Sequence, residues 1–366
     1  MANIHTSLPK TMHAAVMTGV RDRLEVRDVP LPEIGAEDAL VKVVASGICR
    51  SDWHLWNGGW RAWSMNLPEP AVLGHEMGGV IAAVGSAVTH VRVGQRVTVP
   101  FNIACGHCPY CHTGHQNLCD HMTFQQMTAG CGGWAEYARV PTADLNCITL
   151  PDEVDEFSAA ALGCRYMTAW RAVRDRARLK AGETMVIFGC GGVGLAAVEI
   201  CAALGAIPVA VDIDASKLTQ ARSVGAGYAI SAKGRTKEEV ANEVRNVLGG
   251  LGANAALDAL GGSRTSLPAI MSLRKGGRLV QVGLTGNEDE GKVAFPADEI
   301  VNKELSIVGS LGNPHSSFPE LLSLVASGRL KPSALVSRKV ALTDVSDVLE
   351  EMDRFATSGY VIITSF

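Results

Sequence analysis

The sequence predicts an α/β protein of two domains, in which a small β-barrel or sandwich precedes a doubly wound parallel sheet. Three observations support this prediction. The chain has 366 residues, and a typical domain has about 150. Hydrophobic residues make up 47% of it and charged residues 19%, which is the composition of a globular protein. Short valine-rich runs dominate its first part, and apolar runs alternate with helical patterns in its second part.

The first hundred residues predict β-structure. Valine-dense runs of alternating character lie at 39–45 and 91–99, and Gly, Pro and Asp separate such runs. The pattern changes after Pro151, because residues 158–176 are typical of helix. We therefore expect the β-rich part to end near residue 160.

The middle of the chain predicts a parallel sheet. Short apolar runs, each the length of a buried strand, lie at 184–188, 208–211, 255–258, 278–282 and 306–308. An alanine-rich helix is expected at 195–204, between the first two runs. Strands joined by helices form a doubly wound sheet. Towards the C-terminus, the pattern predicts helices at 319–326 and 344–355 and a strand at 360–364.

The charge and the hydropathy of the chain argue against nucleic-acid-binding and membrane-associated proteins. The formal charge is −4 and the pI is about 6.2, so nucleic acid and acidic membrane surfaces are not expected as partners. The most apolar stretch, 193–211, is interrupted by Glu199 and Pro208 and is too short to span a membrane. The N-terminal segment lacks an apolar run, which predicts no secretory signal and a cytoplasmic protein.

Four cysteines lie close together in the segment 102–122. Their spacing is C-x2-C-x2-C-x7-C, formed by Cys105, Cys108, Cys111 and Cys119. Four thiolates close a tetrahedral shell around Zn²⁺ and leave no open position, so the predicted role is structural. A pair of disulfides is the first alternative, and a reducing compartment disfavours it. An iron–sulfur cluster is the second, and ferredoxins use different spacings.

A second set of metal-binding residue types is dispersed along the chain. It contains Cys49-Arg-Ser51-Asp52-Trp-His54, then His75-Glu76, and then Cys164. A lone Cys or His is more often a core residue than a ligand. The residues alone therefore leave this metal site open.

A glycine fingerprint follows the run at 184–188. Gly189, Gly191 and Gly194 form G-x-G-x-x-G between a predicted strand and a predicted helix, and Asp212 follows about twenty residues later. This pattern predicts a dinucleotide site in which Asp212 binds the adenosine ribose. Residues 212–217 contain no Arg, which favours NAD over NADP. The alternative is a glycine-rich turn in another α/β fold.

Taken together and in this order, the motifs resemble those of the zinc-containing alcohol dehydrogenases of the medium-chain dehydrogenase/reductase family. The resemblance covers essentially the whole chain. It implies a GroES-like β-barrel catalytic domain, formed by residues 1–160 and 306–366, and a Rossmann domain at 161–305. It also implies two zinc ions per subunit and NAD as the cofactor.

The resemblance assigns roles at the second set. Cys49, His75 and Cys164 become ligands of a catalytic zinc whose fourth position is open. Glu76 is an alternate ligand behind the metal, and Asp52 orients His75 by accepting its ring N–H.

Further roles concern the proton and the cofactor. Ser51 contacts the substrate hydroxyl, and His54 releases the proton at a near-neutral pKa. Arg50 pairs with the cofactor pyrophosphate. The remaining positions implied to contact the cofactor are Thr168, Gly192, Val193, Lys217, Val282 and Leu284.

The chain departs from the family pattern at two places. Residues 359–364 lack the C-terminal Arg with which well-studied members contact the pyrophosphate, and the sequence does not show what replaces it. Polyol dehydrogenase relatives tend to have a carboxylate where this chain has Cys164, which favours simple alcohols.

Aromatic residues predict the character of the substrate pocket. Trp56, Trp60, Phe101 and Trp134 occupy positions that the resemblance places near the substrate. We therefore expect a bulky hydrophobic pocket suited to secondary, aromatic or medium-chain alcohols. The alternative is that these tryptophans pack the domain surface or a subunit interface.

The predicted function is hydride transfer between a small-molecule alcohol, or a carbonyl compound in reverse, and NAD. A polyol dehydrogenase or carbonyl reductase on the same scaffold is the alternative within enzymes. A zinc-stabilised nucleic-acid-binding module and a binding protein without catalysis are the alternatives outside them. The resemblance implies a homodimer or homotetramer, with an interface near 306–312.

Overall fold

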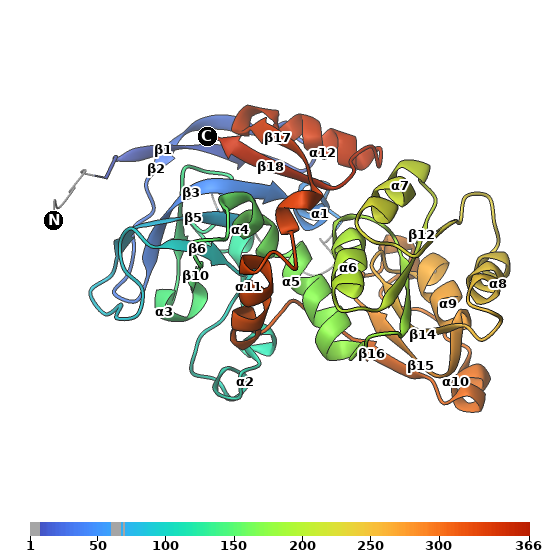
Figure 1. The fold of residues 1–366 in the computed structure, drawn as a ribbon. Coiled ribbons are helices and arrows are strands. Elements are labelled where there is room, and N and C mark those ends of the chain that lie inside the picture. The colour runs from blue at the N-terminus through green and yellow to red at the C-terminus, as the bar shows by residue number, and fades with distance from the viewer. Residues whose placement is uncertain (1–7, 60–66, 69) are drawn as a thin grey trace. The chain divides into compact units, whose positions relative to one another are not determined.

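The computed structural model describes residues 8–59, 67–68 and 70–366 (Figure 1). Within it the chain forms two compact units. The first unit comprises Met1–Cys164, Pro314–Leu322 and Arg338–Phe366, and the second comprises Arg165–Asn313 and Ser323–Ser337. Both ends of the chain therefore belong to the first unit.

The first unit is rich in antiparallel β-structure. Its strands are β1 (Thr11–Met17), β2 (Glu25–Pro30), β3 (Ala39–Ile48), β4 (Ala71–Val72), β5 (Met77–Val84), β6 (Arg96–Val99), β7 (Asn102–Ile103), β8 (Thr123–Phe124), β9 (Tyr137–Val140), β10 (Ile148–Thr149), β17 (Val336–Ala341) and β18 (Tyr360–Ser365). The largest sheet has the order β10-β6-β5-β3-β18-β17, and β9 also pairs with β3. The smaller sheets are β2-β1-β4 and β7-β8.

The C-terminal strand completes the largest sheet. In β18, Val361 lies opposite Ile48 of β3 in an antiparallel pair, and Figure 1 shows this strand beside the N-terminal strands. Both residues are buried in a core that β1 and the last helix also line. The unit therefore depends on residues from both ends of the chain.

The helices of the first unit are short. They are α1 (Arg50–Trp56), α2 (Pro109–His112), α3 (Ala143–Asn146), α4 (Glu156–Leu162), α11 (Phe318–Ala326) and α12 (Val345–Asp353), with 3-10 turns at Gln116–Leu118, Gln125–Met127, His315–Ser317 and Leu342–Asp344. The chain passes from one unit to the other within α11 and β17. Asp155 caps α4 by accepting a hydrogen bond from the Ser158 N–H at 2.6 Å.

The second unit is a parallel sheet with helices on both faces. Its elements are α5 (Arg165–Trp170), a π-helical turn (Arg171–Arg176), β11 (Thr184–Phe188), α6 (Gly192–Ala203), β12 (Ile207–Asp212), α7 (Ala215–Ser223), β13 (Tyr228–Ser231), α8 (Lys237–Val247), β14 (Ala253–Asp258), α9 (Ser263–Met271), β15 (Leu273–Gln281), α10 (Ala297–Lys303) and β16 (Ser306–Gly309), with 3-10 turns at Asn287–Asp289 and Pro332–Leu335. The strand order is β13-β12-β11-β14-β15-β16, and each pairing is parallel. Counted along the chain, this is the order 3-2-1-4-5-6 of dinucleotide-binding sheets.

The structure confirms the predicted fold class and the strands and helices of the parallel sheet. Two expectations are corrected. The run at 91–99 forms a strand only from Arg96, because Gly94 adopts a positive φ of 88° in the turn before it. Residues from 306 were expected to return to the first domain, but β16 pairs in parallel with β15 and extends the second unit to Asn313.

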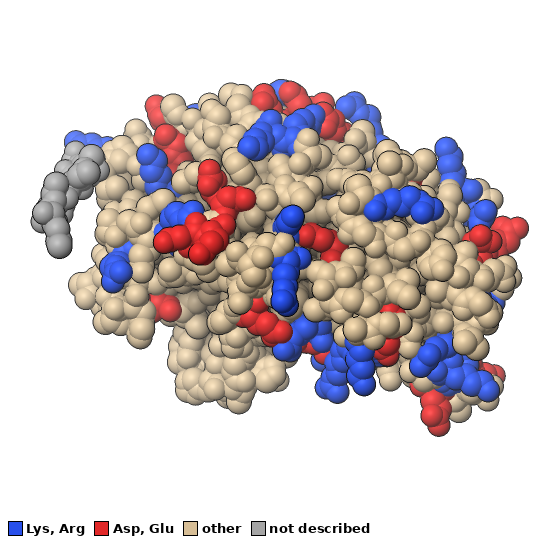
Figure 2. Space-filling model, viewed as in Figure 1, with Lys and Arg blue, Asp and Glu red and all other residues tan. Residues whose placement is uncertain are grey.

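The surface carries charges of both signs. Figure 2 shows Lys and Arg interspersed with Asp and Glu over the face in view. In the part of the chain that the structure describes, no helix is both long enough and apolar enough to cross a bilayer.

Candidate metal and cofactor sites

Three of the predicted metal ligands meet in the first unit. Cys49 follows β3 and precedes α1, His75 follows β4, and Cys164 lies two residues after α4. One ligand atom from each lies within 4.8 Å of the other two. The largest sequence separation in this set spans more than a hundred residues, so the cluster depends on the folded barrel.

A buried carboxylate organises this cluster. Asp52 is fully buried, and its Oδ1 accepts hydrogen bonds from His75 Nδ1 at 2.8 Å and from the Gly74 N–H at 3.1 Å. Its Oδ2 accepts from the Cys49 N–H at 3.2 Å. Since Nδ1 carries the proton that Asp52 accepts, the other ring nitrogen, Nε2, is left to act as a ligand.

The residues fit a zinc ion. His75 Nε2 is buried and makes no hydrogen bond of normal geometry with any described residue. Without a metal, burial alone would lower the pKa of His75, but the Asp52 carboxylate and Cys49 outweigh burial and hold it well above its ordinary value; a bound metal ion would take the place of the proton on Nε2. An imidazole nitrogen and two thiolates are a donor set that Zn²⁺ accepts, and three ligands leave one position open.

A glycine allows Cys164 to approach His75. A Cβ atom at Gly163 would lie 2.8 Å from the Glu76 Cα and 3.2 Å from the His75 carbonyl oxygen. The backbones around the cluster therefore touch at a point where only glycine fits. Glu76 itself is fully buried beside the ligands.

The two predicted proton-transfer residues, Ser51 and His54, follow Cys49 closely in the sequence. The Ser51 hydroxyl is 3.8 Å from the Cys49 sulfur. The near-neutral pKa expected for His54 is wrong, because burial and the charge of Arg50 lower the pKa to about 4, against a smaller opposing effect of Cys49. His54 is therefore neutral at pH 7.

Arg50 is held between two aromatic rings that the sequence analysis did not identify as functional. Its guanidinium carbon lies 3.7 Å from the ring centre of Trp53 and 4.4 Å from that of Phe355, and one nitrogen donates to the Met352 carbonyl oxygen. Burial lowers the pKa of Arg50 to about 10, despite the nearby Asp353, so the group stays charged at pH 7. Phe355 is 59% exposed and adopts a positive φ of 57°.

The four-cysteine segment forms a second compact cluster. The sulfur atoms of Cys105, Cys108, Cys111 and Cys119 all lie within 4.8 Å of one another, and the Cys119 and Cys105 sulfurs are 3.5 Å apart. A Zn–S bond of about 2.3 Å in a tetrahedral shell requires sulfurs about 3.8 Å apart. Backbone N–H groups of Cys105 and His121 point at the Cys119 sulfur at 3.4 and 3.3 Å. The two clusters could therefore hold two zinc ions.

The glycine fingerprint runs from the end of β11 into the first turn of α6, which contains Gly194. Gly189 has a positive φ of 88°, and a Cβ at Gly194 would lie 1.8 Å from the Gly189 carbonyl oxygen. A Cβ at Gly191 would meet nothing within 4 Å. At the end of β12, Asp212 Oδ2 accepts from the Cys190 N–H at 2.7 Å, which ties the carboxylate to the same loop.

The other predicted cofactor residues belong to the same unit. Thr168 is buried on α5, whereas Gly192, Val193 and Lys217 are partly exposed at the starts of α6 and α7. Val282 and Leu284 directly follow β15, and the Leu284 side chain is exposed. Val282 therefore lies just outside the strand that was expected to contain it.

The predicted pocket residues are only partly placed near the metal cluster. The Phe101 ring lies 6.2 Å from the His75 ring and stacks on Phe124 at 5.7 Å. Trp56 and Trp134 are packed in the hydrophobic core, and their indole N–H groups donate to the carbonyl oxygens of Asp22 and Gly47. Both tryptophans are therefore core residues, and neither lies on the domain surface. Trp60 lies outside the described residues.

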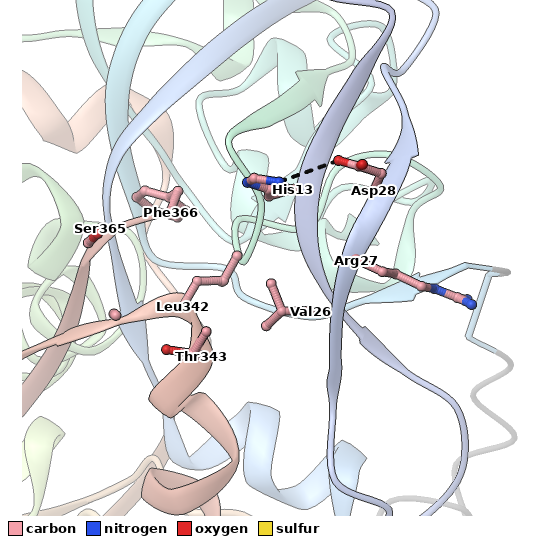
Figure 3. A pocket seen from close by; sticks show the side chains of 9 residues that line it. His13, Val26, Arg27, Asp28, Leu342, Thr343, Ser365 and Phe366 are labelled. Atoms are coloured by element: carbon pink, nitrogen blue, oxygen red, sulfur yellow. Dashed lines mark ion pairs between the residues drawn. The ribbon is translucent and has the colours of Figure 1, made fainter.

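A surface groove of about 410 Å³ lies elsewhere in the first unit (Figure 3). In its lining, His13 of β1 and Asp28 of the neighbouring strand β2 form an ion pair at 3.4 Å, and Leu342 and Phe366 supply apolar surface. The groove contains none of the predicted site residues.

Comparisons with known proteins agree with this geometry. The family model described as alcohol dehydrogenase GroES-like domain matches residues 35–152, and that described as zinc-binding dehydrogenase matches residues 192–327. An alcohol dehydrogenase of Geobacillus stearothermophilus is 33% identical over 356 residues, which cover 96% of this chain and 99% of that protein. A sorbitol dehydrogenase of Bacillus subtilis (strain 168) is 32% identical over 353 residues, 96% of each chain.

A solved structure of an alcohol dehydrogenase is also similar to this chain. The alcohol dehydrogenase TADH from Thermus sp. ATN1 matches with a TM-score of 0.86 at 32% identity, covering 97% of this chain and 100% of that one. A GroES-like unit, a dinucleotide-binding sheet and two zinc-type ligand clusters define a zinc-binding dehydrogenase. The chain belongs to the zinc-containing alcohol dehydrogenases of the medium-chain dehydrogenase/reductase family.

Proposed function

We propose that the protein catalyses reversible hydride transfer between an alcohol and NAD at a zinc ion held by Cys49, His75 and Cys164. One observation carries this proposal: the three ligand atoms lie within 4.8 Å of one another, and Asp52 leaves His75 Nε2 to face them. A group of this composition is built for a metal with one open position, which is the arrangement of catalytic zinc.

The cofactors supply the chemistry that amino acids lack. When bound, Zn²⁺ acts as a Lewis acid that stabilises negative charge on the alcohol oxygen, and NAD⁺ accepts hydride from the alcohol carbon. The protein contributes ligands, orientation and proton handling.

In this proposal, Ser51 and His54, which follow Cys49 in the sequence, transfer the proton of the substrate hydroxyl. The Ser51 hydroxyl, 3.8 Å from the Cys49 sulfur, is positioned to accept a hydrogen bond from the substrate hydroxyl. His54 is neutral at pH 7 because its pKa is about 4. It therefore passes a proton to solvent without holding it for long.

The second unit supplies the cofactor site. The Gly189–Gly194 loop allows the pyrophosphate to approach the backbone, and the Asp212 carboxylate accepts hydrogen bonds from the ribose hydroxyls. A 2′-phosphate beside Asp212 would be repelled, so the site favours NAD over NADP. Arg50 binds phosphate with a charge that Trp53 and Phe355 hold in place.

The four-cysteine cluster is proposed to hold structural zinc. A closed thiolate shell has no position for substrate, and its ion stabilises the loop that contains it. The apolar cluster within residues 102–122 consists mainly of the cysteines themselves.

The substrate is proposed to be a primary or secondary alcohol with an apolar substituent. Stacked Phe101 and Phe124 place an aromatic wall beside His75, which favours apolar groups. A polyol is the second candidate, because the sorbitol dehydrogenase of Bacillus subtilis is 32% identical over 96% of this chain.

Two further properties belong to this proposal. A homodimer or homotetramer is supported by β16, which ends the sheet among the described residues and carries an exposed Ile307. A cytoplasmic location is supported by the two thiolate clusters, which require reduced cysteines.

The test measures zinc per subunit together with NAD⁺ reduction over a panel of alcohols. Wild type should hold two zinc ions, and Cys49→Ser should hold one and lose activity. Cys131→Ser is the matched control, because this buried thiol donates to the Ala129 carbonyl at 3.5 Å and a hydroxyl can do the same. A wild type that reduces NAD⁺ with one zinc or none would overturn the catalytic-zinc proposal. Higher kcat/KM for sorbitol than for hexanol or 1-phenylethanol would select the polyol candidate.

A further inference from the structure

A fully buried carboxylate lies at the point where the parallel sheet reverses its strand order. Asp258 is the last residue of β14, and it pairs in register with Phe188 of β11 on one side and Gln281 of β15 on the other. In open α/β sheets, ligands bind outside the carboxyl ends of the strands at this reversal. Asp258 is 0% exposed, so it lies beneath the loops that form such a crevice.

Four donors satisfy the Asp258 carboxylate. Its Oδ1 accepts from the Leu260 and Gly261 N–H groups at 3.0 and 2.9 Å. Its Oδ2 accepts from the Ser266 hydroxyl at 2.5 Å and from Gln281 Nε2 at 3.0 Å. The donors come from the loop after β14, from α9 and from the end of β15, so one side chain joins three segments.

Asp258 and Gln281 also form hydrogen bonds with the backbone that follows β15. Gln281 Nε2 also donates to the Gly283 carbonyl oxygen at 2.9 Å. The Asp258 carbonyl oxygen accepts from the Val282 and Gly283 N–H groups at 3.1 and 2.9 Å. Residues 282–284 are therefore held by Asp258 through its backbone and, by way of Gln281, through its side chain.

Close packing makes this arrangement stiff. A Cβ at Gly283 would lie 2.2 Å from the Gly261 nitrogen, and a Cβ at Gly261 would lie 2.2 Å from the Leu284 carbonyl oxygen. The two loops touch backbone to backbone. Burying a charge costs free energy even when it is hydrogen bonded, and a core of apolar residues would support two loops without that cost.

We propose that Asp258, acting through Ser266 and Gln281, is a positioning residue that fixes the backbone of residues 282–284 against the nicotinamide end of NAD. This inference rests on the proposed function and on the family resemblance, which implies that the backbone of residues 282–284 contacts the carboxamide of the nicotinamide. The side-chain hydrogen bonds of this network lead to residues 282–284. The adenosine half is bound by Asp212 and the glycine loop, which these hydrogen bonds do not include.

The test compares two ligands that differ at the nicotinamide. The affinities of the zinc-loaded enzyme for NADH and for ADP-ribose, which lacks nicotinamide, are measured for wild type, Asp258→Asn and Ser266→Ala. Asp258→Asn replaces an acceptor oxygen with an NH2 donor, and Ser266→Ala removes one donor. Ser310→Ala is the matched control, because its hydroxyl also follows a strand of this sheet and makes no hydrogen bond with any described residue.

Asp258→Asn should weaken NADH binding about ten-fold, which corresponds to about 1.4 kcal/mol, and leave ADP-ribose binding within about two-fold. Ser266→Ala should shift the ratio in the same direction by a smaller factor, and it decides the question if Asp258→Asn does not fold. Equal weakening of both ligands, or an unchanged ratio in both variants, would overturn the positioning role. A wild type that fails to bind NADH would overturn the proposed function and this inference together.

Discussion

The hydrogen bonds of Asp52 allow a quantitative prediction about the three-residue metal site. Its two carboxylate oxygens accept from His75 Nδ1, from the Gly74 N–H and from the Cys49 N–H. Asp52→Asn keeps the shape of the side chain but offers only one acceptor oxygen. In either orientation of the amide, its NH2 group faces a buried donor.

The expected magnitude follows from these contacts. One buried donor left unpaired costs about 1–3 kcal/mol of folding free energy. Loss of the carboxylate that orients a ligating histidine typically lowers metal affinity by about 10–100-fold. Asp52→Asn should therefore weaken zinc binding at Cys49, His75 and Cys164 by this factor, and leave the four-cysteine site unchanged.

The assay is a stepwise chelator titration with a zinc-sensitive dye, which counts the ions released per subunit. Asp144→Asn is the matched control. Asp144 accepts from the N–H groups of Thr89, His90 and Val91 and contacts His90 Nδ1 at 3.1 Å, and His90 is not a predicted ligand. The control should lower thermal stability and keep both zinc ions. The reasoning is refuted if Asp52→Asn resists the chelator as wild type does, or if the control releases zinc equally.

Three further predictions follow from the same structure. Gly191→Ala should fold normally and lose NADH affinity. Gly194→Ala should lower the unfolding free energy by about 1–3 kcal/mol, because its Cβ would lie 1.8 Å from a carbonyl oxygen. Thermal melts measure the stability of each variant, and NADH titrations measure its affinity for the cofactor. Phe355→Leu removes one ring from Arg50 and should weaken NADH binding by about two- to five-fold, and an unchanged Kd would show that the ring is dispensable. Backbone N–H groups outweigh burial and hold the pKa of Asp144 well below its ordinary value. Its folded pKa is therefore below the unfolded one, so its contribution to stability is present above about pH 4 and is lost as the pH falls further. The Tm of wild type should fall more steeply in acid than that of Asp144→Asn, and parallel curves would contradict this.

Two features whose residues lie close together in the sequence, the four-cysteine segment and the glycine fingerprint, could be predicted from the sequence. The four cysteines lie within fifteen residues, so their spacing favours a closed metal shell over disulfides or an iron–sulfur cluster. The run 184–188, the glycine fingerprint and Asp212 form one strand–turn–helix–strand unit, whose chemistry is set by local backbone demands. The structure accordingly has β11 at Thr184–Phe188 and α6 directly after the loop.

Other properties depend on what surrounds a residue, which the sequence does not show. The pKa of His54 is set by burial and by the neighbouring charges of Arg50 and Cys49, and the spacing of the motif contains no information about burial. Trp56 and Trp134 lie in the core, although an indole is equally suited to a pocket wall. The boundary near 306 was misplaced because a short apolar run does not show which strand it pairs with.

The sequence by itself determined the family, the residue types of both metal clusters and the dinucleotide loop, because each is a pattern of residue types in a fixed order. The tertiary structure alone decided that Cys49, His75 and Cys164 meet within 4.8 Å, and that Asp258 joins the loop after β14, α9 and the end of β15 at the strand reversal. The metal-type ligands come from segments far apart in the chain, and the Asp258 contacts join neighbouring strands of the sheet. Their geometry is fixed by strand pairing and core packing, which set distances that spacing along the chain does not.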